Sequence, residues 1–166
     1  PGLWPLFRWL TRRQFDRMAP VWDEMRTQDA FAPLEVALDS LETSPKQVLD
    51  LGTGDGNTLA LVLAARPNAR GVGLDLQEEM LRRARQKVEA AGRQAEFHVG
   101  DMCELPFEDG SFDVVTSILA LMHVPVRARE QVFAEVARAH RPGGRAIFSV
   151  KNAVFEQMTG ADRFAT

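Results

Sequence analysis

The residues best suited to do chemistry lie in a short glycine-rich segment, VLDLGTGDG, at residues 48–56. An apolar run precedes the glycines and a stretch with helical spacing follows them, so we expect a tight turn between a strand and a helix. A glycine has no Cβ atom, so a ligand can approach the backbone closely at such a turn. Because ordinary turns are also rich in glycine, the loop alone is weak support for a nucleotide-like ligand.

Two aspartates at the ends of later apolar runs strengthen this interpretation. Asp75 ends the segment GVGLD, and Asp101 follows the segment EFHVG. The carboxylate of Asp75 can accept two hydrogen bonds from the diol of a ribose. A carboxylate beside the backbone N–H of Met102 suits the donor and acceptor edge of adenine. For Asp75 alone, a surface aspartate at a strand end is the plainer interpretation. Together, the glycine loop and the two aspartates predict one crevice.

From residue 47 onward, the elements that must position these residues alternate regularly. Short apolar runs rich in β-branched residues predict strands, and the longer stretches between them have the spacing of helices. The expected strands are 47–51, 70–75, 95–99, 112–118 and 145–150, and the expected helices are 57–65, 78–91 and 127–139. This order predicts an α/β fold with a Rossmann-like, doubly wound and mainly parallel sheet. Since parallel strands end at the same edge, the glycine loop and both aspartates should meet there.

Composition and charge narrow the class of protein. Of the 166 residues, 45% are hydrophobic and 26% are charged, as in soluble globular domains. No apolar run approaches the ~20 residues of a membrane-spanning helix, and no signal peptide is visible. A formal net charge of -3 argues against nucleic acid as a partner. The single cysteine, Cys103, excludes an internal disulfide and a multi-cysteine metal site, so we expect no metal and a cytoplasmic location.

Several segments, taken together and in order, resemble the successive motifs of class I S-adenosylmethionine-dependent methyltransferases. They are VLDLGTGDG, GLDLQEEML, GDMCELPFEDGSFDVV and AHRPGGRAIFSV, within residues 48–150. The segments LPFEDGSFDVVTSILALMHV and FDRMAPVWDEM are similar to the small-molecule group that contains the ubiquinone and menaquinone C-methyltransferases. The resemblance implies S-adenosylmethionine as cofactor, S-adenosylhomocysteine as product, and methyl transfer to a small-molecule acceptor.

The resemblance also implies which positions hold the cofactor, each carried over from the matching motif. They are Asp50, Gly52, Thr53 and Gly54 for the methionine part, Asp75 and Leu76 for the ribose, Asp101 and Met102 for the adenine, and Ile118, through its backbone, for the methionine amino group. Trp22 stands where the family often has tyrosine. Its ring either covers the cofactor, with a cation–π contact to the sulfonium, or simply packs in the core.

His123 is the residue with a candidate catalytic role. Near the mouth of the crevice, its imidazole could take a proton from a hydroxyl or an acidic carbon of the acceptor. The plainer interpretation is that its ring hydrogen-bonds backbone and holds the turn. Methyl transfer can proceed without a strong base, because the sulfonium activates its own methyl group and in-line positioning supplies much of the catalysis.

The two ends of the chain differ from the core at 47–150. Residues 1–46 interleave aromatic and arginine residues, so we expect helices outside the sheet that form a lid or substrate segment. Contact with a membrane surface is the alternative interpretation of this segment, and its aromatic residues favour an apolar acceptor. The family sheet usually adds a helix and two antiparallel strands after its fifth strand. Residues 151–166 are too few for these, so the final strands are expected to be missing and the tail to be truncated or atypical.

Two alternatives to a methyl-transfer enzyme stay open. With a short tail, the chain could be a noncatalytic S-adenosylmethionine-binding or regulatory module. A NAD-dependent dehydrogenase is disfavoured, because its G-x-G-x-x-G pattern is replaced here by G-x-G-x-G followed by Asn57. A pyrophosphate would also be repelled by a carboxylate at Asp55. The acceptor, its methylated atom and the oligomeric state are not defined by the sequence.

Overall fold

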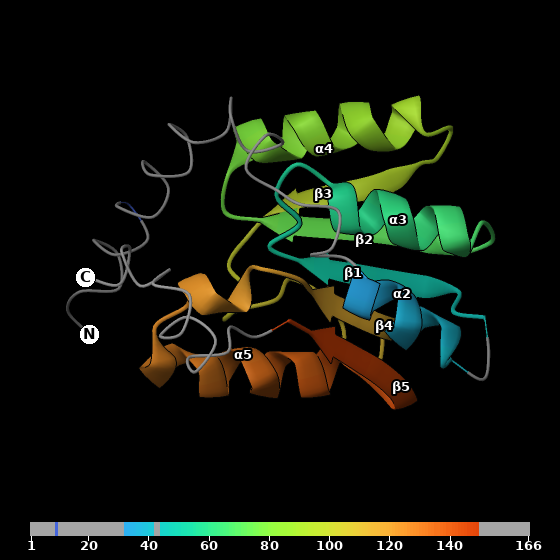
Figure 1. The fold of residues 1–166 in the computed structure, drawn as a ribbon. Coiled ribbons are helices and arrows are strands. Elements are labelled where there is room, and N and C mark those ends of the chain that lie inside the picture. Colours follow the sequence, from blue (N-terminus) through green and yellow to red (C-terminus); the bar gives the residue numbers. More distant parts are fainter. Residues whose placement is uncertain (1–8, 10–31, 42–43, 150–166) are drawn as a thin grey trace, which may run out of the picture.

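The computed structural model describes residue 9 and residues 32–41 and 44–149, and its centre is one sheet (Figure 1). The sheet has five strands in the order β3-β2-β1-β4-β5, and every neighbouring pair is parallel. The strands are β1 Gln47–Leu51, β2 Arg70–Asp75, β3 Ala95–Val99, β4 Phe112–Ser117 and β5 His140–Phe148. Their carboxyl ends lie along one edge, at the left in Figure 1, which we call the carboxyl edge.

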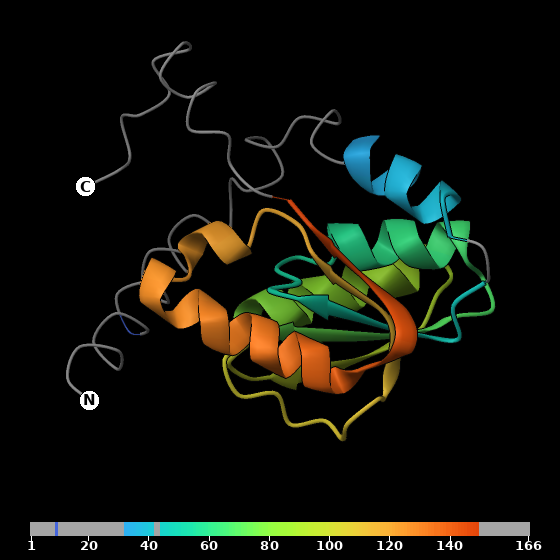
Figure 2. The ribbon, with the colours of Figure 1, turned by 90° about the horizontal axis from the view of Figure 1, so that it is seen from below.

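Helices cover both faces of this sheet. They are α2 Ala32–Asp39, α3 Asn57–Ala65, α4 Glu78–Ala90 and α5 Val126–Ala139, and a short 3₁₀ helix, η3, spans Leu121–His123. Figure 2 shows α2 and α3 on one side of the sheet and α5 on the other. Val88 of α4 packs against Leu59 and Leu63 of α3, so these two helices share a face. The predicted α/β fold with a doubly wound parallel sheet is therefore confirmed.

The central strand β1 is apolar on both faces because helices cover both. Val48 packs with Leu34 of α2 on one face, and Leu49 packs with Val132 of α5 on the other. All four side chains are 0% or 1% exposed. A strand buried on both faces has a continuous apolar sequence, and the residues before the glycine loop have this character.

The predicted bounds of β1, β2, β3 and α3 are confirmed, but the predicted start of the last strand is wrong. The sequence pattern predicts a turn at 142–144 ahead of that strand, whereas β5 begins at His140 and runs through the turn residues. The pairing of β4 with β5 shifts register between Phe112 and Val114, so the extra residues of β5 form a bulge. Gly143 permits the bulge because it adopts φ +82°.

Only part of the N-terminal segment lies within the described residues. Its helix α2 buries Leu34 and Leu38 against the sheet. Residues 1–8, 10–31 and 42–43, which include Trp22, and residues 150–166 lie outside the described residues, so the predictions for a lid, for Trp22 and for an atypical tail stay predictions. Among the helices that the structure describes, none has the length and apolar character needed to cross a bilayer.

Candidate functional site

The glycine loop after β1 turns at the carboxyl edge and is bound to the neighbouring strand. The backbone N–H groups of Gly52 and Thr53 both donate to the carbonyl of Leu74, at 2.8 and 3.1 Å. Gly52, Gly54 and Gly56 have φ values of +65°, +55° and +84°. These values lie in the left-handed region, where a side chain is disfavoured, so the alternation of glycines follows from the shape of the turn.

Three strand ends meet at Gly52. A Cβ atom placed on Gly52 would lie 2.5 Å from Cβ of Ala120, which follows β4. The same atom would lie 3.2 Å from Cε of Met102, which follows β3. The loops after β1, β3 and β4 are therefore in contact at this glycine, as the shared-edge prediction requires.

Asp50 connects the glycine loop to β4 from within the core. Its side chain is 1% exposed, and it accepts hydrogen bonds from Oγ1 of Thr53 and Oγ1 of Thr116, each at 2.7 Å. A buried carboxylate needs such donors to offset its desolvation. Asp50 therefore fixes the position of the loop relative to the end of β4.

Asp55 anchors the other end of the loop to α4. Nζ of Lys87 lies 2.6 Å from its Oδ2, and the amide of Asn57 also donates to this carboxylate. Gly56 is needed at the same junction, because a Cβ on it would lie 2.8 Å from Cα of Ala84. The charge of Asp55 is thus paired with that of Lys87, so the case against a pyrophosphate rests on the glycine spacing and not on repulsion.

Asp75, at the end of β2, points its carboxylate at the glycine loop. Gly54 N–H donates to Oδ2 at 2.9 Å, and Gln77 N–H donates to Oδ1 at 3.0 Å. Burial raises the pKa of Asp75, although the backbone N–H groups of Gly54, Gln77 and Leu76 partly oppose the rise. Each carboxylate oxygen has two lone pairs, so both can accept a further hydrogen bond from a diol.

The loop after β3 carries Asp101 and Met102 beside Asp75. Gly100 N–H donates to the carbonyl of Asp75 at 2.9 Å, and Cys103 N–H donates to Oδ1 of Asp101 at 2.9 Å. The Asp101 carboxylate therefore shapes its own turn, and the preceding residue joins this turn to the backbone of the ribose-binding candidate. The thiol of Cys103 lies 3.9 Å from the carbonyl of Ala128 in α5, which agrees with a packing role.

The segment after β4 holds the remaining candidates. Ile118 is half-buried and packs against the core between α2, α3 and the sheet. His123 is exposed at the end of η3, and its backbone N–H donates to the carbonyl of Ala120 at 3.0 Å. Arg129 of α5 secures this turn by donating from Nε to the carbonyl of Val124 at 2.9 Å. The exposed imidazole lies on the turn that contacts the glycine loop.

The candidate residues differ in how far they are exposed. Asp50 and Thr53 are buried, His123 is exposed, and the half-buried positions are Gly52, Gly54, Asp75, Leu76, Asp101, Met102 and Ile118.

The sequence analysis missed a set of hydrogen bonds that clamps the loop after β3, in which Arg138 of α5 donates to the carbonyls of Leu105 and Phe107. The hydrogen bond from Arg138 also lowers the pKa of Glu135, which accepts from Leu105 N–H. No short motif signals this clamp, because its partners are far apart in the chain.

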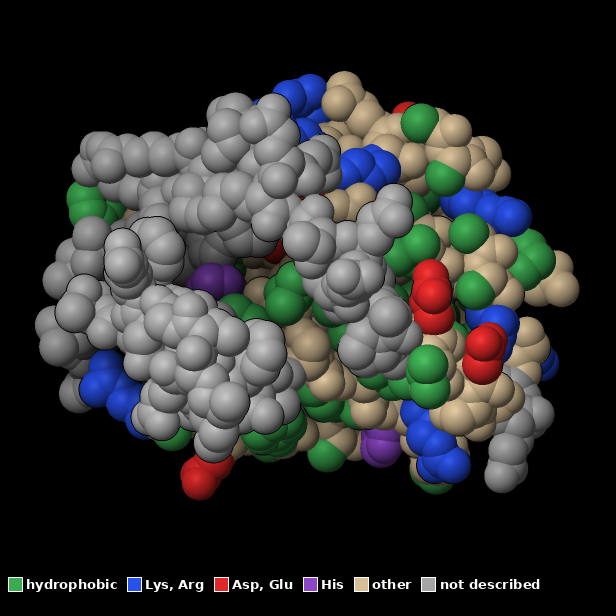
Figure 3. Space-filling model, in the orientation of Figure 1, with side chains coloured by type: hydrophobic (Ala, Val, Ile, Leu, Met, Phe, Trp, Pro, Cys, Tyr) green, Lys and Arg blue, Asp and Glu red, His purple; other side chains and the backbone are tan. Residues whose placement is uncertain are grey.

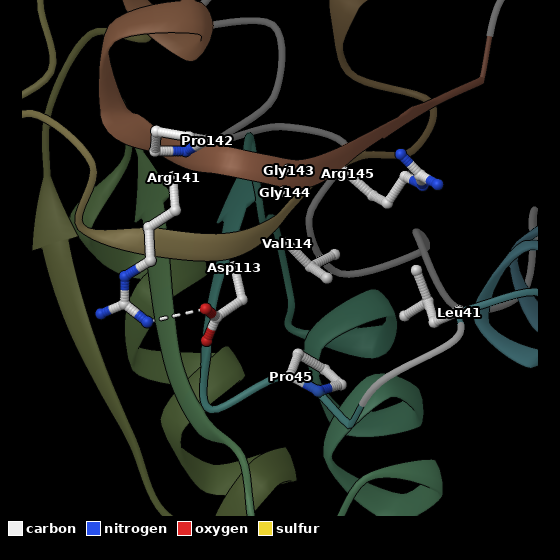
Figure 4. Close-up of a pocket in the computed structure, with 9 residues that line it drawn as sticks. All are labelled: Leu41, Pro45, Asp113, Val114, Arg141, Pro142, Gly143, Gly144 and Arg145. Atoms are coloured by element: carbon white, nitrogen blue, oxygen red, sulfur yellow. Dashed lines mark hydrogen bonds and ion pairs between the residues drawn. The ribbon is translucent and has the colours of Figure 1, made fainter.

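A pocket of ≈ 300 Å³ lies at the opposite, amino-terminal edge of the sheet (Figure 4). Its lining includes Asp113, Arg141 and Arg145, and none of the candidate residues at the carboxyl edge. Oδ1 of Asp113 is 2.7 Å from Nη1 of Arg141, and its Oδ2 accepts the backbone N–H of Gln47 at 2.8 Å. Asp113 and Arg141 thus tie β4, β5 and the start of β1 together, which is a structural role.

Charge and metal-ligating residues add no second site among the described residues. In Figure 3 the Lys and Arg side chains of the described residues are spread around the visible face and do not gather in one basic patch. Within the same residues, no group of three or more His, Cys, Asp or Glu side chains could hold a metal ion. The carboxyl edge is the place where candidate residues converge.

Comparison with known proteins agrees with this geometry. The family described as "Methyltransferase domain" matches residues 48–144. The chain belongs to the class I S-adenosylmethionine-dependent methyltransferase family. The match covers the glycine loop, both strand-end aspartates and the turn after β4, so it includes every candidate residue except Trp22. The predicted family is therefore confirmed.

Individual relatives of this methyltransferase domain come from distant organisms. A demethylmenaquinone methyltransferase of Thermus thermophilus is 42% identical over 109 residues, which are 65% of this chain and 48% of that protein. A 24-methylenesterol C-methyltransferase of Arabidopsis thaliana is 37% identical over 112 residues, 66% of this chain and 30% of that protein. The PH0226 protein of Pyrococcus horikoshii has a TM-score of 0.73 at 28% identity, covering 92% of this chain and 72% of that chain. The chain spans 30% to 58% of the length of the first four curated relatives.

Proposed function

We propose that this domain binds S-adenosylmethionine across the carboxyl edge and transfers its methyl group to a small apolar acceptor. The observation that carries the proposal is the meeting of three loops at Gly52, where a Cβ would lie 3.2 Å from Cε of Met102 and 2.5 Å from Cβ of Ala120. The loops after β1, β3 and β4 and the end of β2 thereby form one continuous binding surface. Ligands of doubly wound sheets bind at this edge.

The chemistry of the donor set fits this cofactor. S-adenosylmethionine presents a ribose diol, an adenine edge and an ammonium group, which need acceptors and a backbone donor. Asp75 offers a carboxylate for the diol, and Asp101 with the N–H of Met102 offers an acceptor and a donor for adenine. The carbonyl of Ile118 is the proposed acceptor for the ammonium group. No phosphate has to be accommodated, which agrees with a glycine loop that departs from the dinucleotide spacing.

Binding and orientation are the main tasks of these residues. The cofactor supplies a methyl group on a cationic sulfur, which is already an electrophile. The hydrogen bond from Thr53 to the carboxylate of Asp50 holds the glycine loop in place beside the methionine part. A site organised in advance loses little entropy on binding and keeps the reacting atoms aligned.

The proposed acceptor is a small molecule with a large apolar part. The relatives named above carry the names of a demethylmenaquinone and a methylenesterol enzyme, and both acceptors are apolar. His123 is the proposed proton acceptor, because its exposed ring lies on the turn that borders Gly52 through Ala120. We place the protein in a reducing cytoplasm, since a sequence with Cys103 as its one cysteine forms no internal disulfide.

A transfer assay tests this function. The gene product that carries this chain is incubated with S-adenosylmethionine labelled in its methyl group and with a demethylated quinone or a sterol, and reactions without acceptor serve as controls. Label should appear in the apolar acceptor. A preparation that binds S-adenosylhomocysteine but transfers label to neither acceptor class would contradict the proposed apolar acceptor.

A further inference from the structure

One residue at the carboxyl edge has a backbone conformation that its side chain disfavours. Leu119, two residues after β4, has φ +58°, and it is the one non-glycine residue with positive φ in the described part of the chain. In this left-handed region the Cβ atom crowds the following carbonyl oxygen. Such a conformation persists only where surrounding contacts impose it, and it is most common at functional sites.

Ser149, the residue that follows β5, supplies those contacts. Its hydroxyl oxygen accepts the backbone N–H of Leu119 at 2.6 Å. Its own backbone N–H donates to the carbonyl of Ser117 at 3.1 Å. These two hydrogen bonds lie on either side of Ile118, so Ser149 holds the backbone of that residue from both neighbours.

The strained turn also determines what faces the glycine loop. Immediately after Leu119 the chain returns to the right-handed region, with φ -112° and ψ -44° at Ala120, and η3 begins. This change of direction places the methyl group of Ala120 against Gly52. A relaxed Leu119 would move Ala120 and the carbonyl of Ile118 together.

We propose that Ser149 is a positioning residue for the cofactor, acting through the left-handed conformation of Leu119. The proposal rests on the proposed function, because it assumes that the backbone of Ile118 binds the methionine ammonium group. Ser149 has no contact with the cofactor in this account. Ser149 sets the direction of the Ile118 carbonyl and the position of the Ala120 methyl group against Gly52.

The first test measures the affinity for S-adenosylhomocysteine by calorimetry, at a temperature where every variant is folded. Ser149→Ala should weaken binding about tenfold, the loss expected when one hydrogen bond that organises the site is removed. Ser149→Thr keeps a hydroxyl and should retain affinity. Ser111→Ala is the control, since the Ser111 hydroxyl also has one hydrogen bond with backbone, which it donates to the carbonyl of Glu108 at 2.7 Å, away from the site.

The second test separates positioning from simple stabilisation. Glycine adopts the left-handed conformation without strain, so Leu119→Gly should remove the need for the Ser149 hydroxyl. The Ser149→Ala and Leu119→Gly double variant should therefore bind S-adenosylhomocysteine within about twofold of Leu119→Gly alone. If Ser149→Ala alone does not fold, this comparison of the two glycine variants decides the same question.

The outcomes distinguish the two proposals. If the native chain does not bind S-adenosylhomocysteine, the proposed function fails. If the native chain binds and Ser149→Ala binds equally well, with only a lower melting temperature, Ser149 is merely structural and the positioning role is wrong. A tenfold loss that persists in the Leu119→Gly background would also overturn the account, because the effect would not pass through Leu119.

Discussion

Gly52 and Ala120, from loops after β1 and β4, approach so closely that a Cβ on Gly52 would lie 2.5 Å from that of Ala120. Real Cβ atoms do not come this near, so either the glycine loop or the turn after β4 would have to move. Gly52, Thr53 and Gly54, candidates for the methionine part of the cofactor, lie on the first loop, and Ile118, the candidate for its ammonium group, lies on the second. The close contact at Gly52 is therefore a requirement of the site as well as of the fold.

Gly52→Ala should destabilise the domain more than a substitution that costs backbone strain alone. The variant combines a left-handed conformation, at φ +65°, with a clash against Ala120, and we expect a loss of about 2–4 kcal/mol in the free energy of unfolding. Gly92→Ala is the matched control, because Gly92 has φ +68° but open space around its Cβ position. It should lose only about 1–2 kcal/mol. Urea unfolding measures both, and equal losses would argue against the clash.

The acid stability of the domain should depend on Glu135. Its hydrogen bond with Arg138 lowers its pKa below the ordinary value of 4.5. A carboxylate with a lowered pKa contributes stability above its unfolded-state pKa, and this contribution disappears as the pH falls through the folded-state value. The free energy of unfolding should therefore fall less between about pH 5 and pH 3 in Glu135→Gln than in the native chain.

Urea unfolding at a series of pH values measures this effect. Glu108→Gln is the control, because Glu108 is an exposed carboxylate in the same loop. The two variants should differ below pH 5, with the flatter profile in Glu135→Gln. Identical profiles would show that the clamp between Arg138 and Glu135 does not stabilise the loop that carries Asp101 and Met102.

His123→Gln should separate proton transfer from cofactor binding. A positioned base contributes about 10²–10⁴ to a rate, so methyl transfer should fall by at least about a hundredfold. Affinity for S-adenosylhomocysteine should stay within about twofold, since the exposed ring is proposed to face the acceptor. His98→Gln is the control, because His98 lies on β3 beside Phe107 and not on the turn after β4. Unchanged transfer would assign His123 to holding the turn.

Local patterns predicted the parts of this domain that depend on neighbours in sequence. The apolar runs that end at Leu51 and Asp75 are strands whose side chains are mostly buried under helices. Their bounds, and those of the edge strand that ends at Val99, were predicted correctly. The glycine spacing predicted a tight turn after the first of these strands, and the structure shows that Gly52 has the positive φ such a turn needs. Among the described residues, the candidates that the family motifs named lie at or beside the carboxyl edge.

Long-range contacts explain what local patterns missed. The start of β5 depends on pairing with β4, which draws 140–144 into the strand despite their turn-like sequence. The strained Leu119 and its partner Ser149 are separated by 30 positions, so no motif connects them. The clamp from Arg138 to the loop at Leu105 spans a similar distance along the chain. Such contacts become visible only once the fold is known.

Calorimetric titration of the chain with S-adenosylhomocysteine tests the central claim most directly. The native chain should bind, and Asp75→Ala should bind at least about tenfold more weakly, because a charged hydrogen-bond acceptor is lost from the ribose position. Asp39→Ala is the matched control, since Asp39 is an exposed carboxylate at the end of α2, and it should bind like the native chain. Binding of NAD without binding of S-adenosylhomocysteine, or equal affinity of Asp75→Ala and the native chain, would contradict the site described above.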